Sequence, residues 1–358
     1  MNTRRIAVIV CNLGGPDGQA AVRPFLFNLF NDKAIIAAPQ PVRFALALLI
    51  SSLRAKGARA NYALMGGGSP IVAQTRRQAD ALDAELAKRC AGKNLEIKTF
   101  LAMRYWRPDM RAAAQQAKDW GASEAVLLPL YPQFSTSTTG SSLAAWKRLS
   151  ALPTRAVCCY PTEKHVIAAH VQAIKDAWLK GGEPPAPRVL FSAHGLPQSI
   201  VDRGDPYPWQ IAASVAAVCA LLPAHWDKQI CYQSRVGPLK WIGPSTEEAL
   251  KQAAKDGQGV LLSPIAFVSE HVETLVELDH EYGALAKALG LPYYLRVPAL
   301  GICEAFIAGL ADICERAIAD HQEIRSAQGG RICPAAWKQC PMRQDNLQSA
   351  EAGAATCS

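Results

Sequence analysis

Short apolar runs alternate with amphipathic segments along most of the chain. The apolar runs have the length of β-strands and lie at 6–11, 97–103, 125–130, 156–160, 189–193, 229–233, 259–267 and 293–297. Several are apolar at nearly every position, which is typical of parallel strands that are covered on both faces. Segments with helical periodicity lie between them, at 70–90, 108–119, 163–179, 245–255 and 302–320. This alternation predicts an α/β fold with parallel sheets and right-handed crossovers.

The two halves of the chain also resemble each other. RIAVIVCNLGGP at 5–16 is similar to RVLFSAHGLP at 188–197, and 107–138 is similar to 243–274. We therefore expect two similar domains, residues 1–155 and 156–320, followed by a C-terminal extension at 321–358. Segment 35–66 lies outside the repeat and combines an apolar face with basic residues. Its pattern suits either an amphipathic helix packed on its own domain or an apolar lip over a ligand or a membrane surface.

Composition narrows the class of protein. The chain has 358 residues, of which 50% are hydrophobic and 19% are charged, which excludes a wholly disordered or fibrous chain. The net charge of +8 comes without a run of five basic residues, so we expect an anionic ligand or membrane surface and no nucleic acid partner. The 11 cysteines are an odd number and no secretory signal precedes them, which favours a reducing cytoplasm. The uncharged stretch 125–146 is too polar in its second half to span a membrane.

Ionisable side chains follow two of the predicted strands in the second half. His194 comes directly after the run 189–193, and ligands of open α/β sheets bind beyond the carboxyl ends of the strands. Glu270, Glu273 and Glu277 have the i, i+3, i+7 spacing of one helix face, with His271 beside them. Such a set suits proton transfer or a divalent cation. A hydrogen-bonded turn histidine and a solvated acidic face are the alternatives.

The first half offers turns rich in glycine and hydroxyl groups, at 12–17, 65–70 and 131–142. They suit anion binding by backbone N–H groups, but none has a nucleotide-binding pattern. Arg104 and Tyr105 follow a predicted strand and suit a carboxylate ligand, while Trp241 offers a flat apolar face.

In order and spacing, these segments resemble the ferrochelatase family over residues 5–320. The shared motifs are NLGGP, GGGSPI, MRYWRP, YPQFSTSTTGSS, FSAHGLP, DRGDPYP, YQSRVGPLKWIGP and SPIAFVSEHVETLVELDHEY. The resemblance implies the chelatase fold, which has two flavodoxin-like (Rossmann-like) domains around a cleft. It also implies an enzyme of haem biosynthesis that inserts Fe(II) into protoporphyrin IX to form protohaem.

The resemblance assigns roles to individual residues. His194 corresponds to the catalytic histidine, which would accept pyrrole protons, and Glu273 to the carboxylate that faces it. The implied metal or proton path comprises His194, Glu273, Glu270, His271 and Glu277. The implied porphyrin pocket comprises Leu13, Tyr62, Ser69, Arg104, Tyr105 and Trp241. Segment 35–66 corresponds to an apolar lip, through which we expect peripheral contact with the inner face of a membrane.

Some members of this family carry a [2Fe–2S] cluster held by one internal cysteine and three near the C-terminus. The candidates here are Cys158, with Cys159 as an alternative internal ligand, and Cys333, Cys340 and Cys357. Met342 stands where a third closely spaced cysteine would be expected, so free thiols are the alternative.

Other functions remain open on the sequence alone. They are a chelatase for another metal or tetrapyrrole, a non-catalytic porphyrin or haem carrier and a flavodoxin-type redox protein. The sequence also leaves open protoporphyrin or coproporphyrin as the substrate, and a monomer or a homodimer.

Overall fold

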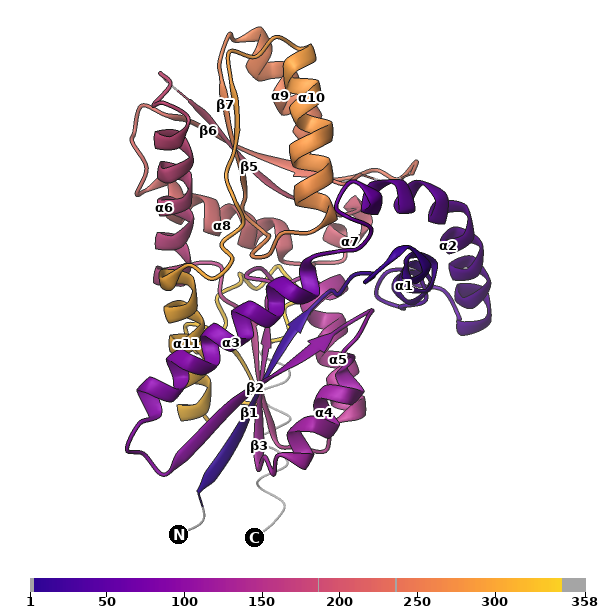
Figure 1. Cartoon of the computed structure of the whole chain (residues 1–358), viewed down its shortest axis with the longest axis vertical. Coiled ribbons are helices and arrows are strands. Elements are labelled where there is room, and N and C mark those ends of the chain that lie inside the picture. The colour runs from indigo at the N-terminus through magenta and orange to yellow at the C-terminus, as the bar shows by residue number, and fades with distance from the viewer. Residues whose placement is uncertain (1–2, 186, 236, 343–358) are drawn as a thin grey trace.

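The chain forms two α/β units, each built on a parallel sheet (Figure 1). A computed structural model describes residues 3–185, 187–235 and 237–342. The first sheet has the order β2-β1-β3-β4-β9, with β1 at Arg4–Asn12, β2 at Leu95–Met103, β3 at Glu124–Pro129, β4 at Thr154–Cys159 and β9 at Ile324–Ser326. The second has the order β6-β5-β7-β8, with β5 at Arg188–His194, β6 at Asp227–Gln233, β7 at Val260–Pro264 and β8 at Tyr294–Arg296. The orders β2-β1-β3-β4 and β6-β5-β7-β8 are equivalent, as the internal repeat predicts.

Helices connect the strands and cover both sheets. In the first half they are η1 (Gln19–Ala21), α1 (Val22–Phe30), α2 (Gln40–Ala63), α3 (Ile71–Cys90), α4 (Met110–Asp119), η2 (Thr136–Gly140) and α5 (Ser141–Leu149). The remainder are α6 (Lys164–Lys180), α7 (Gln198–Asp202), α8 (Tyr207–Cys219), α9 (Thr246–Lys255), η3 (Glu273–Glu281), α10 (Tyr282–Ala288) and α11 (Glu304–Ala319). Each predicted strand and helix is confirmed, while the short strand β9 was not expected.

The chain returns to the first unit after it has built the second. Helix α11 and strand β9 both pack in the first unit, although they follow β8 in sequence. The expected boundary at 155/156 falls inside β4, which belongs to the first sheet. The two units are therefore joined by more than one crossing of the chain.

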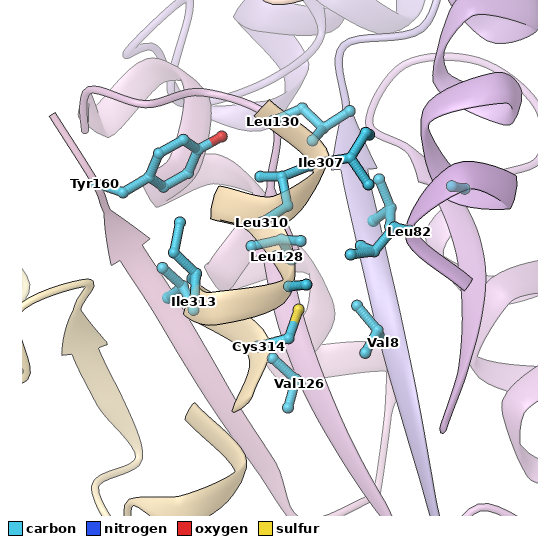
Figure 2. Packing of buried hydrophobic residues seen from close by; sticks show 14 of the residues in the cluster. Val8, Leu82, Val126, Leu128, Leu130, Tyr160, Ile307, Leu310, Ile313 and Cys314 are labelled. Carbon is cyan, nitrogen blue, oxygen red and sulfur yellow. The ribbon is translucent and has the colours of Figure 1, made fainter. Parts of the chain in front are cut away.

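Helix α11 completes the core of the first unit (Figure 2). The side chain of Cys314 lies beside Val126, and those of Ile307 and Leu310 lie nearer to Leu130 and Leu128. Burying an aliphatic side chain of this size contributes about 1.5–3 kcal/mol. The last helix of the chain is thus held in the first unit by apolar burial.

Two buried polar side chains hold the units together. On α3, the Gln78 amide donates from Nε2 to the Val268 carbonyl at 2.7 Å and to the Gly301 carbonyl at 2.9 Å, and it accepts from Ser269 Oγ at 2.8 Å. Asp205 in the second unit accepts hydrogen bonds from Ser135 Oγ at 2.9 Å and from the Thr136 backbone N–H at 2.8 Å. Both side chains are at most 1% exposed, so loss of either would leave buried polar groups unpaired.

Helix α2 lies at the side of the first unit and exposes apolar side chains (Figure 1). The exposed fraction reaches 73% at Leu53 and 55% at Leu49. Arg54 and Lys56 on the same helix are also exposed. Most of segment 35–66 is therefore helix α2, which has an uncovered apolar surface beside basic residues. Among the described residues, no helix is both long enough and apolar enough to cross a membrane.

Because of His170 on α6, we expect the folded state to lose stability in acid. Burial lowers its pKa from 6.5 to about 4. Between these two values the unfolded chain binds a proton that the folded chain does not, so the free energy of unfolding falls as the pH drops from 6.5 to 4. The full loss is about 3 kcal/mol. We expect His170→Leu to flatten this decline in urea denaturation, whereas His225→Leu, at an exposed position, should leave it unchanged. An equally steep decline in His170→Leu would contradict the prediction.

Candidate functional site

His194 ends β5, a central strand of the second sheet, at the carboxyl edge where open α/β sheets bind their ligands. Its Nδ1 lies 2.6 Å from the Gly195 carbonyl oxygen. Since a carbonyl can only accept, Nδ1 must carry the hydrogen, and in the neutral ring Nε2 keeps a free lone pair. A side chain at position 195 would place its Cβ 3.0 Å from the Gln233 carbonyl oxygen, so it would push this backbone away from His194.

Glu273 lies between two imidazoles. Its Oε1 is 3.6 Å from His194 Nε2, and its Oε2 is 3.5 Å from His271 Nε2. Burial by itself would raise the pKa of Glu273, but the two histidines outweigh burial and lower this pKa to about 2. Glu273 is therefore an anion at neutral pH and stabilises positive charge on either ring.

The three glutamates do not share one helix face. Residues 273–281 form a π-helix, and Glu270 lies outside it in the preceding loop. Glu270 Oε1 accepts from Arg296 Nη1 at 2.6 Å, and the attraction of Arg296 contributes to a lowered pKa of Glu270 against the effect of burial. Glu277 accepts from the Ser234 backbone N–H at 2.6 Å and from the Tyr282 hydroxyl at 2.9 Å. The expectation of three carboxylates in line on one helix face is therefore wrong, and each carboxylate has its own partners.

The first unit supplies an apolar surface that faces this centre. Tyr62 of α2 and Tyr105 pack in one buried cluster, with Leu13 and Val272 against it. Val272 directly precedes Glu273, so this cluster joins the two units beside the carboxylate. Glu273 adds to the effect of burial in raising the pKa of Tyr62, which keeps the Tyr62 hydroxyl protonated.

The other expected pocket residues lie at two turns. Ser69 donates its backbone N–H to the Pro16 carbonyl at 2.7 Å, and a side chain at Gly15 would come within 2.5 Å of Ser69 Cβ. Trp241 pairs with Pro197 and would lie 3.2 Å from a side chain at Gly195, which places the indole beside the His194 turn. Ser69 therefore lies at a turn of the first unit, and Trp241 lies beside the His194 turn of the second unit.

Arg104 and Tyr105 are held by an aspartate that the sequence did not single out. Asp32, between α1 and α2, accepts from Arg104 Nη2 at 2.6 Å and from the Tyr105 hydroxyl at 2.8 Å, and it also bonds the Ser141 hydroxyl. Burial opposes its ionisation, but these donors and the Ala34 backbone N–H hold the pKa of Asp32 below its usual value. The cluster lines a cavity of about 560 Å³. No motif marks Asp32, because its partners come from distant segments.

Four cysteines gather in a separate cluster of buried side chains, which we call the cysteine pocket. Cys158, Cys159, Cys333 and Cys340 share one buried apolar cluster with Met342, and the Sγ atoms of Cys158 and Cys159 are 3.5 Å apart. Neighbouring thiols and burial raise the pKa of both Cys159 and Cys333. Cys357, the remaining expected ligand, lies outside the described residues. Across residues 3–185, 187–235 and 237–342, no three His, Cys, Asp or Glu side chains converge as ligands of one metal ion.

Comparison with known proteins defines first the fold class and then the family. The solved structure of SirB from Bacillus subtilis with Fe3+ matches with a TM-score of 0.52 at 12% identity, over 88% of this chain and 96% of SirB. This likeness shows a shared fold and confirms the expected architecture.

The sequence comparisons are more specific. A family model described as Ferrochelatase matches residues 5–318. Proteins named ferrochelatase are 54% identical in Phenylobacterium zucineum, over 95% of this chain and 98% of the relative, and 52% identical in Hyphomonas neptunium, over 95% and 96%. The chain belongs to the ferrochelatase family. It is an enzyme that inserts a metal into a porphyrin, with Fe(II) as its metal substrate, as the sequence motifs predicted.

Proposed function

We propose that this enzyme forms protohaem from protoporphyrin IX and Fe(II), with His194 as the proton acceptor and Glu273 as its charge partner. The observation that carries this assignment is the partly buried Glu273 carboxylate between two imidazoles at the domain junction. Metal insertion releases the two pyrrole N–H protons of each porphyrin macrocycle, so it requires a base beside the porphyrin nitrogens. His194 Nε2 has the free lone pair for this role.

Proton transfer follows from the charges around His194. When Nε2 takes a pyrrole proton, the imidazolium that forms lies 3.6 Å from the Glu273 anion, which stabilises it. The His194 side chain is 38% exposed, so the proton can pass to solvent before the second pyrrole N–H reacts. Glu273 itself stays ionised because its pKa is about 2. We assign it the role of a fixed countercharge.

We also propose that His194, Glu273 and His271 form the path for the incoming iron. Glu270 and Glu277 would keep the backbone segments beside this path in place. Imidazole nitrogen and carboxylate oxygen both suit Fe(II). Glu270 and Glu277 are engaged with Arg296 and with Ser234, so they fix the segments on either side of Glu273.

The porphyrin would lie against the first unit. We propose Leu13, Tyr62 and Tyr105 as contacts for the macrocycle, with Trp241 and Ser69 at its edges. Arg104 suits a propionate because its guanidinium is oriented by Asp32 and by Ser141 Oγ at 2.7 Å. A flat apolar ring needs such a surface to be bent and desolvated.

We propose that α2 rests on a membrane surface, where an apolar porphyrin is supplied. Exposed Leu49 and Leu53 would enter the interface, and Arg54 and Lys56 would meet anionic headgroups. Contact of this kind is peripheral.

We further propose that the cysteine pocket holds a [2Fe–2S] cluster through Cys158, Cys159, Cys333 and Cys340. Four thiols in one apolar pocket are the donor set that such a cluster requires, and two irons spread four ligands more widely than one ion does. The cluster would supply a one-electron centre and link β4 to the C-terminal segment. In this proposal Cys159 takes the place that the family resemblance assigns to Cys357.

We expect His194→Ala to lower the rate of anaerobic Fe(II) insertion about 10²- to 10⁴-fold. Porphyrin binding, followed by fluorescence quenching, should change little, and His225→Ala should match the unsubstituted enzyme. Full activity in His194→Ala would overturn the assignment of the base. Binding of protoporphyrin without turnover in the unsubstituted protein would favour a carrier, and turnover with another metal alone would favour a different chelatase.

Charge reversal on α2 tests the membrane proposal. The pair Arg54→Glu and Lys56→Glu should weaken binding to vesicles of mixed phosphatidylglycerol and phosphatidylcholine by about tenfold or more, since each basic residue contributes about 1 kcal/mol near an anionic surface. The control pair Arg111→Glu and Lys118→Glu reverses two exposed charges on α4. Unchanged co-sedimentation of the α2 variant would contradict the proposal.

Iron and sulfide analysis with electron paramagnetic resonance tests the cluster and its ligands. Anaerobically purified protein should show the signal of a reduced [2Fe–2S] centre after dithionite. Cys159→Ser should abolish or alter this signal, whereas Cys357→Ser and Cys303→Ser should retain it. Loss of the signal in Cys357→Ser together with its retention in Cys159→Ser would reverse the assignment of the fourth ligand.

A further inference from the structure

Gln210 on α8 is a buried amide that joins the cysteine pocket to the domain junction. Its Nε2 lies 3.1 Å from Cys333 Sγ, and its Oε1 accepts the Phe134 backbone N–H at 2.7 Å. The side chain is fully buried. Phe134 belongs to the loop between β3 and η2 in the first unit, so the Gln210 side chain contacts both this loop and a cysteine sulfur.

The orientation of this amide is fixed by chemistry. A backbone N–H can only donate, so the oxygen of Gln210 must face Phe134. The NH₂ group must then face the sulfur. The donor toward Cys333 is therefore an N–H group whichever protonation state the cysteine has.

We infer that Gln210 raises the reduction potential of the proposed cluster by donating an N–H···S hydrogen bond to Cys333. This inference rests on the [2Fe–2S] centre proposed above. One electron converts one Fe(III) of the oxidised cluster to Fe(II) and adds a negative charge to the centre. A hydrogen bond to a ligand sulfur stabilises the more negative, reduced form, and hydrogen bonds to sulfur are among the factors that set the potentials of such clusters.

Gln133 provides a matched comparison. It is a buried glutamine at the same junction, and its Nε2 donates to Ser214 Oγ on α8 at 2.9 Å. Its amide has no sulfur partner among the hydrogen bonds of the described residues. Replacing Gln133 therefore removes a comparable buried amide that makes no hydrogen bond to a cysteine sulfur within the described residues.

The test is a dye-mediated redox titration of the anaerobic full-length enzyme, followed by electron paramagnetic resonance. Gln210→Leu should lower the midpoint potential, with a change of about tenfold in the ratio of reduced to oxidised cluster at a fixed potential, which is 59 mV for one electron. Gln133→Leu should titrate like the unsubstituted protein. A midpoint in Gln210→Leu equal to that of the unsubstituted protein would overturn the inference, as would an equal shift in both variants.

A second measurement keeps the inference testable if Gln210→Leu does not fold. Pulsed electron paramagnetic resonance of the unsubstituted reduced protein, refolded or exchanged in D₂O, should show an exchangeable deuteron coupled to the cluster and a nearby ¹⁴N. Absence of this coupling in a protein that carries the cluster would overturn the inference. Absence of iron, sulfide and signal altogether would instead overturn the proposed cluster, so the two failures are distinct.

Discussion

The arrangement of the candidate site depends on one ionised carboxylate, that of Glu273, at the junction of the two units. Burial opposes the charge of Glu273, and two imidazoles that approach its two oxygens compensate for it. His194 comes from the end of β5 and His271 from the loop after β7, so the arrangement exists only while these two backbone segments keep their positions. A shift of about 1 Å in either would weaken a site of this kind substantially.

The fold meets this constraint with buried polar contacts and with the path of the chain. Gln78 on α3 donates to the Val268 carbonyl, in the loop before Glu270, and to the Gly301 carbonyl, in the turn before α11. It thereby holds both segments against the first unit. Helix α11 then packs in the core of the first unit. The loop that carries His271 is therefore attached to the first unit through Val268, and the chain that follows is attached through α11. Loss of one of these buried hydrogen bonds would leave donors or acceptors unpaired.

Periodicity and motifs predicted the strands, the repeat and His194, because these features are local in sequence. The partners of the site were not predictable in this way. Asp32 acquires its role from Arg104 and Ser141, which lie in distant segments, and Gln210 acquires its role from Phe134 and Cys333. The spacing of the glutamates suggested an α-helical face, but the segment forms a π-helix and each carboxylate has its own partners. Spacing carries no information about such tertiary contacts.

The pairing of Arg104 also changes how the first unit can recognise a carboxylate. A free guanidinium attracts any anion, whereas Arg104 is already neutralised by Asp32 at 2.6 Å. Selectivity for a propionate at this position must then come from the fixed direction of the remaining N–H groups rather than from net charge. Because Asp32 also bonds Tyr105, the same carboxylate orients both the polar and the aromatic contact proposed for the porphyrin. If Arg104 binds a propionate as proposed, the affinity of the pocket depends on shape and orientation more than on the net charge of +8 that the chain carries.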